Sequence, residues 1–164
     1  MPTLTTRLAI VRHAWAEEIS STGDDFSRAL TRKGCRRFAR LVEKLRRGGL
    51  AIDVVATSPL VRAVQTAELL AEGLGGEARI DVVDALAPGS DWQASIDWTI
   101  GQDAARVAWV GHAPCVGRLV ALSIGDGSAA IRMPKGAVAS IRLDDGPGQP
   151  GELEWLATAE LFDE

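Results

Sequence analysis

The sequence is poor in several residue types and patterns, and each shortage excludes a class of protein. Its 164 residues contain two cysteines, two histidines and no tyrosine. Two cysteines do not make a disulfide framework, so we expect a reduced, cytoplasmic protein. No run of about 18 apolar residues occurs, which argues against a membrane partner. Residues 1–7 are short and polar, so we expect no secretory signal.

An excess of positive charge is also missing. The 18 lysines and arginines are outnumbered by 22 acidic residues, which gives a net charge of −4. Nucleic-acid-binding domains are usually basic, so no nucleic-acid partner is expected. A composition of 46% hydrophobic and 24% charged residues is ordinary for a globular protein. The length suits one core, and we predict a single domain over residues 1–164.

Several catalytic motifs are absent. There is no Gly-x-Ser-x-Gly elbow and no P-loop. Cysteine-phosphatase chemistry requires an arginine six residues after the cysteine, but that position is Leu41 after Cys35 and Ala121 after Cys115. Cys115 stands three residues after His112, yet no second cysteine or carboxylate cluster completes a metal site. We therefore predict no metal site.

The sequence does contain an alternation of strand and helix signals. Apolar runs predict strands at residues 8–11, 54–57, 78–83, 106–110, 137–143 and 153–159. Helical spacing predicts helices that begin after Thr31, Ser58, Asp91 and Ala113. Thr31 and Ser58 are the expected N-caps of the first two helices, with Pro59 at the first helical position. The pattern predicts an α/β fold with one mixed, mainly parallel sheet and helices on both faces.

The two histidines fall at equivalent places in this pattern. Arg12-His13 directly follows the first strand, and Gly111-His112 directly follows the strand at 106–110. Open α/β sheets bind ligands outside the carboxyl ends of their strands. We therefore expect both imidazoles in one reaction centre.

Two arginines complete the candidate site. Arg62 is expected one turn inside a helix N-terminus, where a guanidinium reaches back toward the strand ends beside free backbone N–H groups. Arg12 adjoins His13 at the first strand end. Such a set suits a phosphoryl group: one imidazole attacks phosphorus while the cations balance the charge of its oxygens. The alternative for Arg62 alone is a solvated helix residue.

Three segments then point to a family. Val11-Arg12-His13-Ala14 resembles the Arg-His-Gly signature of the histidine phosphatase superfamily, the phosphoglycerate mutase-like group. Residues 58–67, with the sequence SPLVRAVQTA, resemble its second signature, and Gly111-His112-Ala113-Pro114 resembles its third. The stretch at residues 30–34 also matches, so the resemblance spans residues 8 to about 122. The short chain is most similar to the SixA-type phosphohistidine phosphatases.

The resemblance implies a phosphoglycerate mutase-like three-layer domain and a set of roles. His13 would be the nucleophile, and Arg12, Arg62 and His112 would hold the phosphoryl group. Arg28 matches an arginine of the SixA-like group and would help to bind substrate. No metal or organic cofactor is implied. Position 14 is alanine rather than glycine, as is common in this subgroup.

The remaining site residues are predicted from their places beside these motifs. Ser58, Ala113 and Trp15 are expected to contact substrate. The general acid has no obvious equivalent after the second signature, and the candidates are Glu17, Glu18 and Asp91. A phosphohistidine substrate eases this need, because imidazole leaves more readily than an alkoxide.

These residues favour a phosphatase that forms a covalent phosphohistidine and acts on phosphohistidine carried by a protein. The alternatives are a small-molecule phosphomonoesterase of the same superfamily, whose substrate would be a small phosphate ester, and a non-catalytic phosphate- or phosphoprotein-binding module. One further feature is the basic side of the first helix. It carries Lys33, Arg36, Arg37, Arg40, Lys44 and Arg47. This side is either a solvated face or a docking surface for an acidic protein.

Overall fold

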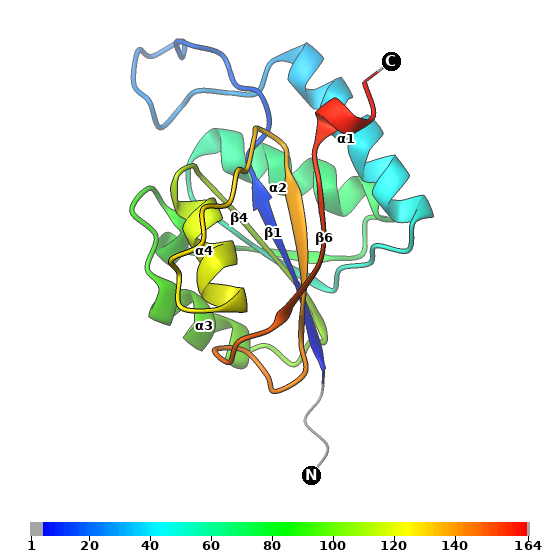
Figure 1. Ribbon diagram of the computed structural model, residues 1–164. Helices are drawn as coiled ribbons and strands as arrows, with labels where there is room; N and C mark the ends of the chain where they lie inside the picture. The colour runs from blue at the N-terminus through cyan, green and yellow to red at the C-terminus, as the bar shows by residue number, and fades with distance from the viewer. Residues whose placement is uncertain (1–4, 164) are drawn as a thin grey trace.

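Six strands form one sheet at the centre of the structure, a computed structural model that describes residues 5–163 (Figure 1). The strands are β1 (Thr6–Arg12), β2 (Val54–Thr57), β3 (Arg79–Val82), β4 (Arg106–Gly111), β5 (Val138–Leu143) and β6 (Glu152–Ala157). Their order is β3-β2-β4-β1-β5-β6. The first four in this order run parallel, and β5 pairs antiparallel with both β1 and β6. The predicted mixed, mainly parallel sheet is confirmed.

Helices cover both faces of the sheet. The helices α1 (Arg32–Arg47) and α2 (Val61–Gly73) lie on one face, and α3 (Trp92–Ile100) and α4 (Cys115–Ile124) lie on the other (Figure 1). Single 3₁₀ turns follow β3 at Asp84–Leu86 and β6 at Ala159–Leu161. The three-layer prediction is therefore also confirmed. Within residues 5–163, no helix has the length and apolarity needed to cross a bilayer.

The alternation of side chains along β1 explains the two layers. Leu8 and Ile10 pack toward α3 and α4, whereas Ala9 and Val11 pack toward α1 and α2. Trp109 on β4 is fully buried and donates its indole N–H to Thr99 Oγ1 at 2.9 Å. Each such large apolar side chain stabilises the fold by about 1.5–3 kcal/mol. The two central strands are thus a fixed platform for the residues at their carboxyl ends.

The helix starts agree with the sequence in one case and differ in another. Thr31 caps α1 as predicted, with its Oγ1 accepting the Gly34 N–H at 2.8 Å. The helix α2 begins at Val61 rather than at Pro59, because Leu60 has an extended backbone and is itself the N-cap. The Ser58 hydroxyl is instead bonded to His112, so the predicted Ser58 cap is wrong.

Candidate active site

The two histidines meet at one edge of the sheet. The strands β1 and β4 are parallel neighbours, and Arg12 pairs with Gly111 in their register. His13 and His112 therefore leave the same edge, with their ring centroids 5.2 Å apart and the rings tilted by 51°. Both are buried, with 7% and 3% of their surfaces exposed. The convergence expected from the sequence is present in the structure.

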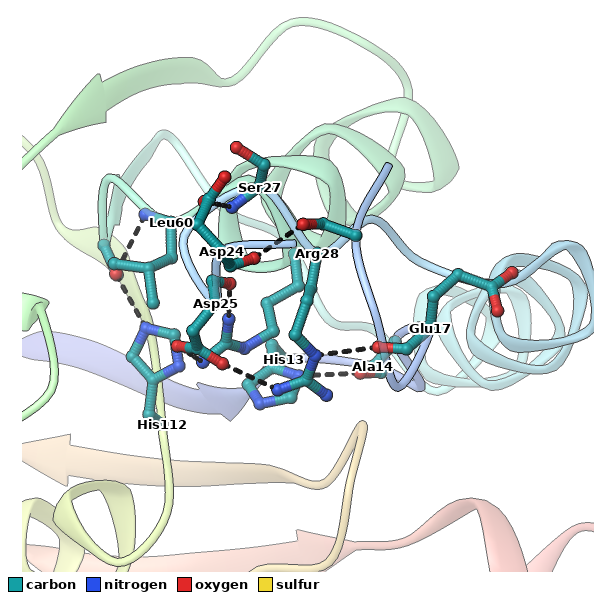
Figure 2. A network of polar contacts seen from close by, with 12 residues as sticks. His13, Ala14, Glu17, Asp24, Asp25, Ser27, Arg28, Leu60 and His112 are labelled. Atoms are coloured by element: carbon teal, nitrogen blue, oxygen red, sulfur yellow. Dashed lines mark hydrogen bonds and ion pairs between the residues drawn. The ribbon is translucent and has the colours of Figure 1, made fainter. Parts of the chain in front are cut away.

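A backbone hydrogen bond fixes the tautomer of His13. Its Nδ1 lies 2.7 Å from the carbonyl oxygen of Ala14 (Figure 2). A carbonyl oxygen only accepts, so Nδ1 carries the hydrogen and donates it. The neutral ring then has its lone pair on Nε2. His13 is thus oriented to use Nε2 as a nucleophile.

A different contact orients His112. Its Nε2 lies 2.7 Å from the hydroxyl oxygen of Ser58, and that oxygen also accepts the Leu60 N–H at 3.3 Å. The Ser58 hydroxyl hydrogen is free to be donated to Nε2, which places the His112 hydrogen on Nδ1. Ser58 is itself fully buried, and in this geometry it positions His112. Its contact with substrate stays a prediction.

Three buried nitrogen atoms of this group have no hydrogen-bond partner among the described residues. They are Arg12 Nε, Arg62 Nε and His112 Nδ1. Buried donors without partners are uncommon in folded proteins and require an explanation. All three belong to residues that the sequence assigns to one anion, and a tetrahedral oxyanion would accept from several donors at once. The donor set therefore fits a phosphoryl group.

The environment keeps both imidazoles neutral at ordinary pH. Burial lowers the pKa of His13 to about 3, and repulsion from the nearby imidazole and guanidinium groups adds to this effect. Burial likewise lowers the pKa of His112 to about 4, with the charge of Arg62 as the next cause. A neutral imidazole is the form that attacks phosphorus, so the unliganded site holds its nucleophile ready.

The loop between β1 and α1 brings an acidic residue that the sequence did not single out. Asp25 accepts from Arg62 Nη2 at 3.1 Å and from Arg28 Nη1 at 2.8 Å (Figure 2). The Asp25 carbonyl oxygen also accepts from Arg62 Nη1 at 2.9 Å. The hydrogen bond from Arg28 is the main cause that lowers the pKa of this carboxyl, which is therefore ionised at neutral pH. Its one sequence signal is the three-residue spacing to Arg28, which places two opposite charges together in a turn.

The second signature also holds this loop in place. Gln65 Oε1 accepts the Leu30 N–H at 2.7 Å, and Thr66 Oγ1 accepts the Ala14 N–H at 3.0 Å. Thr66 donates in turn to the Arg62 carbonyl at 2.7 Å. Adjacent residues of α2 therefore fasten both ends of the loop that follows His13. This accounts physically for the Gln-Thr pair of the motif.

The other predicted site residues lie around this centre. Arg28 is half-buried and donates from Nε to the Glu17 carbonyl at 2.8 Å, while Trp15 is half-buried and Ala113 is exposed. None of the three candidate acids forms a hydrogen bond or ion pair with either histidine, and all three lie within the described residues. Glu17 is directed away from His13 (Figure 2), Glu18 is exposed, and Asp91 caps α3 by accepting from Ala94 N–H at 3.0 Å. Within residues 5–163, no three potential metal ligands gather.

Replacement of Asp25 by asparagine should tighten the binding of an oxyanion. The carboxylate occupies Arg62 and repels an incoming dianion, whereas asparagine retains an acceptor oxygen without the charge. We expect inorganic vanadate to bind about fivefold more tightly, the size of one exposed charge interaction. Inhibition constants or calorimetry would measure the change.

Asp24→Asn is the matched control for this prediction. Asp24 carries the same charge one residue away, and its carboxylate accepts from Ser27 N–H at 2.8 Å and from Thr22. Equal tightening in the two variants would attribute the effect to net charge and contradict the role given to Asp25.

Comparison with protein-family models places most of the chain in a known family. The model of the histidine phosphatase superfamily (branch 1) matches residues 8–124. Two related sequences cover most of the chain. An uncharacterized protein of Picosynechococcus is 32% identical over 140 residues, which are 82% of this chain and 84% of the relative. Phosphohistidine phosphatase SixA of Escherichia coli is 28% identical over 149 residues, 89% of each chain.

Solved structures agree with the fold. The protein histidine phosphatase SixA in complex with tungstate has a TM-score of 0.84 and 26% identity, over 96% of this chain and all of that one. Phosphoglycerate mutase of Plasmodium falciparum has a TM-score of 0.63 and 17% identity, over 92% of this chain and 89% of that one. The fold is thus phosphoglycerate mutase-like, as the sequence resemblance implies.

Proposed function

Because the chain belongs to the histidine phosphatase superfamily (branch 1), we propose that it is a metal-independent phosphatase that removes phosphoryl groups from protein phosphohistidine through a covalent intermediate on His13. One observation carries this proposal. The His13 imidazole is neutral, donates from Nδ1 to the Ala14 carbonyl, and so has its Nε2 lone pair free beside the unpartnered donors of Arg12, Arg62 and His112.

The first step transfers the phosphoryl group to the enzyme. The Nε2 lone pair of His13 attacks phosphorus, and the bond from phosphorus to the substrate nitrogen breaks. The substrate ring carries a proton on its second nitrogen, takes the electron pair of that bond and leaves as a neutral imidazole. The guanidinium groups of Arg12 and Arg62 and the Nδ1–H of His112 balance the charge on the equatorial oxygens.

The second step returns the enzyme to its starting state. A water molecule attacks the phosphorus of phospho-His13, and the bond to Nε2 breaks with its electron pair returning to the ring. Inorganic phosphate is released, and the proton of the water passes to phosphate or solvent. The hydrogen bond from Nδ1 to the Ala14 carbonyl holds the ring in one orientation through both steps.

The weakness of acid catalysis at this site favours a phosphohistidine substrate. Within residues 5–163, no carboxyl group is hydrogen-bonded or ion-paired to either imidazole. Asp25 is the acid on Arg62, and its pKa is lowered by its hydrogen bond from Arg28, so it holds no proton at neutral pH. An alkoxide leaving group must be protonated by a donor as it departs, whereas a phosphohistidine ring that already carries a proton on its second nitrogen leaves as a neutral imidazole. The SixA name of the Escherichia coli relative supports the same choice.

A panel of substrates tests this function. The purified protein would be offered a protein phosphorylated on histidine, the same protein phosphorylated on serine, and sugar phosphates. We expect kcat/KM for phosphohistidine to exceed the others by about 100-fold, because only the ester substrates need a proton from the enzyme, whereas the phosphohistidine ring brings its own. Faster hydrolysis of sugar phosphates would indicate a small-molecule phosphomonoesterase. Binding without turnover of any member would indicate a non-catalytic module.

A further inference from the structure

A second basic pocket opens beside the candidate active site. Its volume is about 290 Å³, and its lining includes four cations, Arg12, Arg37, Arg132 and Lys135, together with Trp15 and Glu160. Arg12 is the residue that this pocket shares with the phosphoryl-binding group. The pocket therefore adjoins the place of the chemistry without including the histidines or Arg62.

One wall of the pocket is fixed to the nucleophile. Arg12 Nη1 donates to the Met133 carbonyl at 3.0 Å, and the Gly136 N–H donates to the His13 carbonyl at 3.1 Å. Lys135 lies between these two anchored residues. Its backbone position relative to His13 is therefore set by the fold, and the residue lines the pocket.

The opposite wall is ordered by an aromatic contact. The guanidinium carbon of Arg37 lies 4.2 Å from the centroid of the Trp15 ring. That ring also packs on Gly136, where a Cβ atom would come within 3.2 Å of it. Stacking on tryptophan leaves the N–H groups of a guanidinium free for an anion. Trp15 thus links the two walls and presents Arg37 to the pocket.

Carboxylates of this chain already rest on the arginines of the pocket. Glu160 pairs with Arg132 at 3.5 Å, and Asp163 accepts from Arg37 Nε at 3.1 Å. Both acidic side chains are about half exposed, so these pairs are weak and exchangeable. Lys135 has no ion-pair partner within residues 5–163. Glu160 thus lies in the pocket, Asp163 reaches Arg37 from the adjoining groove, and Lys135 is left without an ion-pair partner among the described residues.

The positive surface extends beyond the pocket along α1. A groove that shares Arg37 and Ala159 with the pocket is lined by Lys33, Arg36, Arg40, Lys44 and Arg47. These residues span most of a 16-residue helix, which is about 24 Å long. A small phosphate ester cannot reach along such a surface, whereas an acidic polypeptide can. This charge pattern stands out in a protein whose net charge is −4.

We propose that the pocket of Arg37, Arg132 and Lys135 is a second anion subsite, which binds a carboxylate side chain of the protein substrate close to its phosphorylated residue. The inference rests on the proposed function and adds a sequence preference to it. Substrates with glutamate or aspartate beside the phosphohistidine are favoured over neutral ones.

Matched peptides test the subsite. Two peptides would each carry one histidine phosphorylated with phosphoramidate, flanked on both sides by glutamate in one peptide and by glutamine in the other. We expect kcat/KM to be about tenfold higher for the glutamate peptide at low salt, the range of one charge-assisted hydrogen bond. The preference should shrink at high ionic strength, because exposed charges are screened.

Two sets of variants give opposite expectations. Arg132→Gln/Lys135→Gln should reduce the preference to about one. Glu160→Gln/Asp163→Asn should increase it, because these carboxylates compete for the same arginines. The control is Arg79→Gln/Arg142→Gln. These two arginines lie at the amino ends of the parallel strands, away from the candidate active site, and pair with Asp81 and Asp144. The control should keep the preference of the wild type.

The outcomes separate the two proposals. Equal rates for both peptides, or equal losses in the test and control variants, would overturn the subsite while leaving the phosphatase intact. A second experiment compares kcat/KM for phenyl phosphate with kcat/KM for 4-carboxyphenyl phosphate. A carboxylate preference confined to these esters would overturn the polypeptide occupant. Failure to hydrolyse either peptide, with turnover of the esters, would overturn the proposed phosphohistidine activity itself.

Discussion

His13→Asn is expected to abolish phosphatase turnover and the covalent intermediate together. Asparagine retains an amide N–H near the position of Nδ1 and so keeps the donor to the Ala14 carbonyl, but it has no nucleophilic Nε2. Loss of a nucleophile typically lowers kcat on the order of 10⁴–10⁶-fold. Rapid quenching with radiolabelled substrate would show an acid-labile, alkali-stable label on the wild type and none on the variant.

His112→Gln is the matched control for the loss of the nucleophile. Glutamine keeps a polar group that reaches Ser58, while His13 remains in place. We expect slower turnover with the label still formed, because only a donor to the phosphoryl oxygens is lost. A His13→Asn protein that labels like the wild type would show that the phosphoryl group is carried elsewhere.

The second large effect is a loss of stability in mild acid. Both histidines have folded-state pKa values, about 3 for His13 and about 4 for His112, below the usual value near 6.5. The unfolded chain therefore binds more protons than the folded protein between pH 6.5 and about pH 3. We expect the free energy of unfolding to fall by about 5 kcal/mol between pH 7 and pH 4.5, because each histidine contributes about 1.4 kcal/mol for each of the roughly two pH units between pH 6.5 and pH 4.5.

Urea unfolding at a series of pH values would measure this loss. The stabilising contribution is complete above pH 6.5 and declines as the pH falls toward the folded-state values. The double variant His13→Asn/His112→Gln removes both imidazoles, and its stability should change less over the same range. Identical slopes for the two proteins would assign the acid sensitivity to carboxyl groups. Saturating vanadate should also protect the wild type, because it binds the folded state alone.

The sequence was sufficient for the fold because its signals were local and consistent. Alternating apolar runs and helical spacing placed every strand and helix near its observed position. The parallel pairing of β1 with β4 followed from the general behaviour of α/β folds, and it brought His13 and His112 together. The start of α2 was misplaced because a tertiary contact overrode a local preference. The Ser58 hydroxyl bonds His112 rather than the helix.

The contribution of Asp25 could not be predicted in the same way. The loop after β1 has no apolar period, and its path depends on contacts to α2 that are distant in sequence. Gln65 and Thr66 hold the loop, and only then does the carboxylate reach Arg62. From the sequence, the basic side of α1 could be interpreted only as a surface of that helix alone. This basic side is continuous with the pocket at Arg12 because the fold places residues 132–135 beside Trp15 and Arg37.

The adjacency of β1 and β4 also has a consequence for biosynthesis. The strand β1, which His13 directly follows, leaves the ribosome before its parallel partner β4, which comes about 100 residues later. The pairing spans most of the chain, and contacts of such high sequence separation form late in folding. A nascent chain therefore exposes its reactive imidazole long before the second imidazole and the buried arginines surround it. The two imidazoles come together only after β4 has paired with β1.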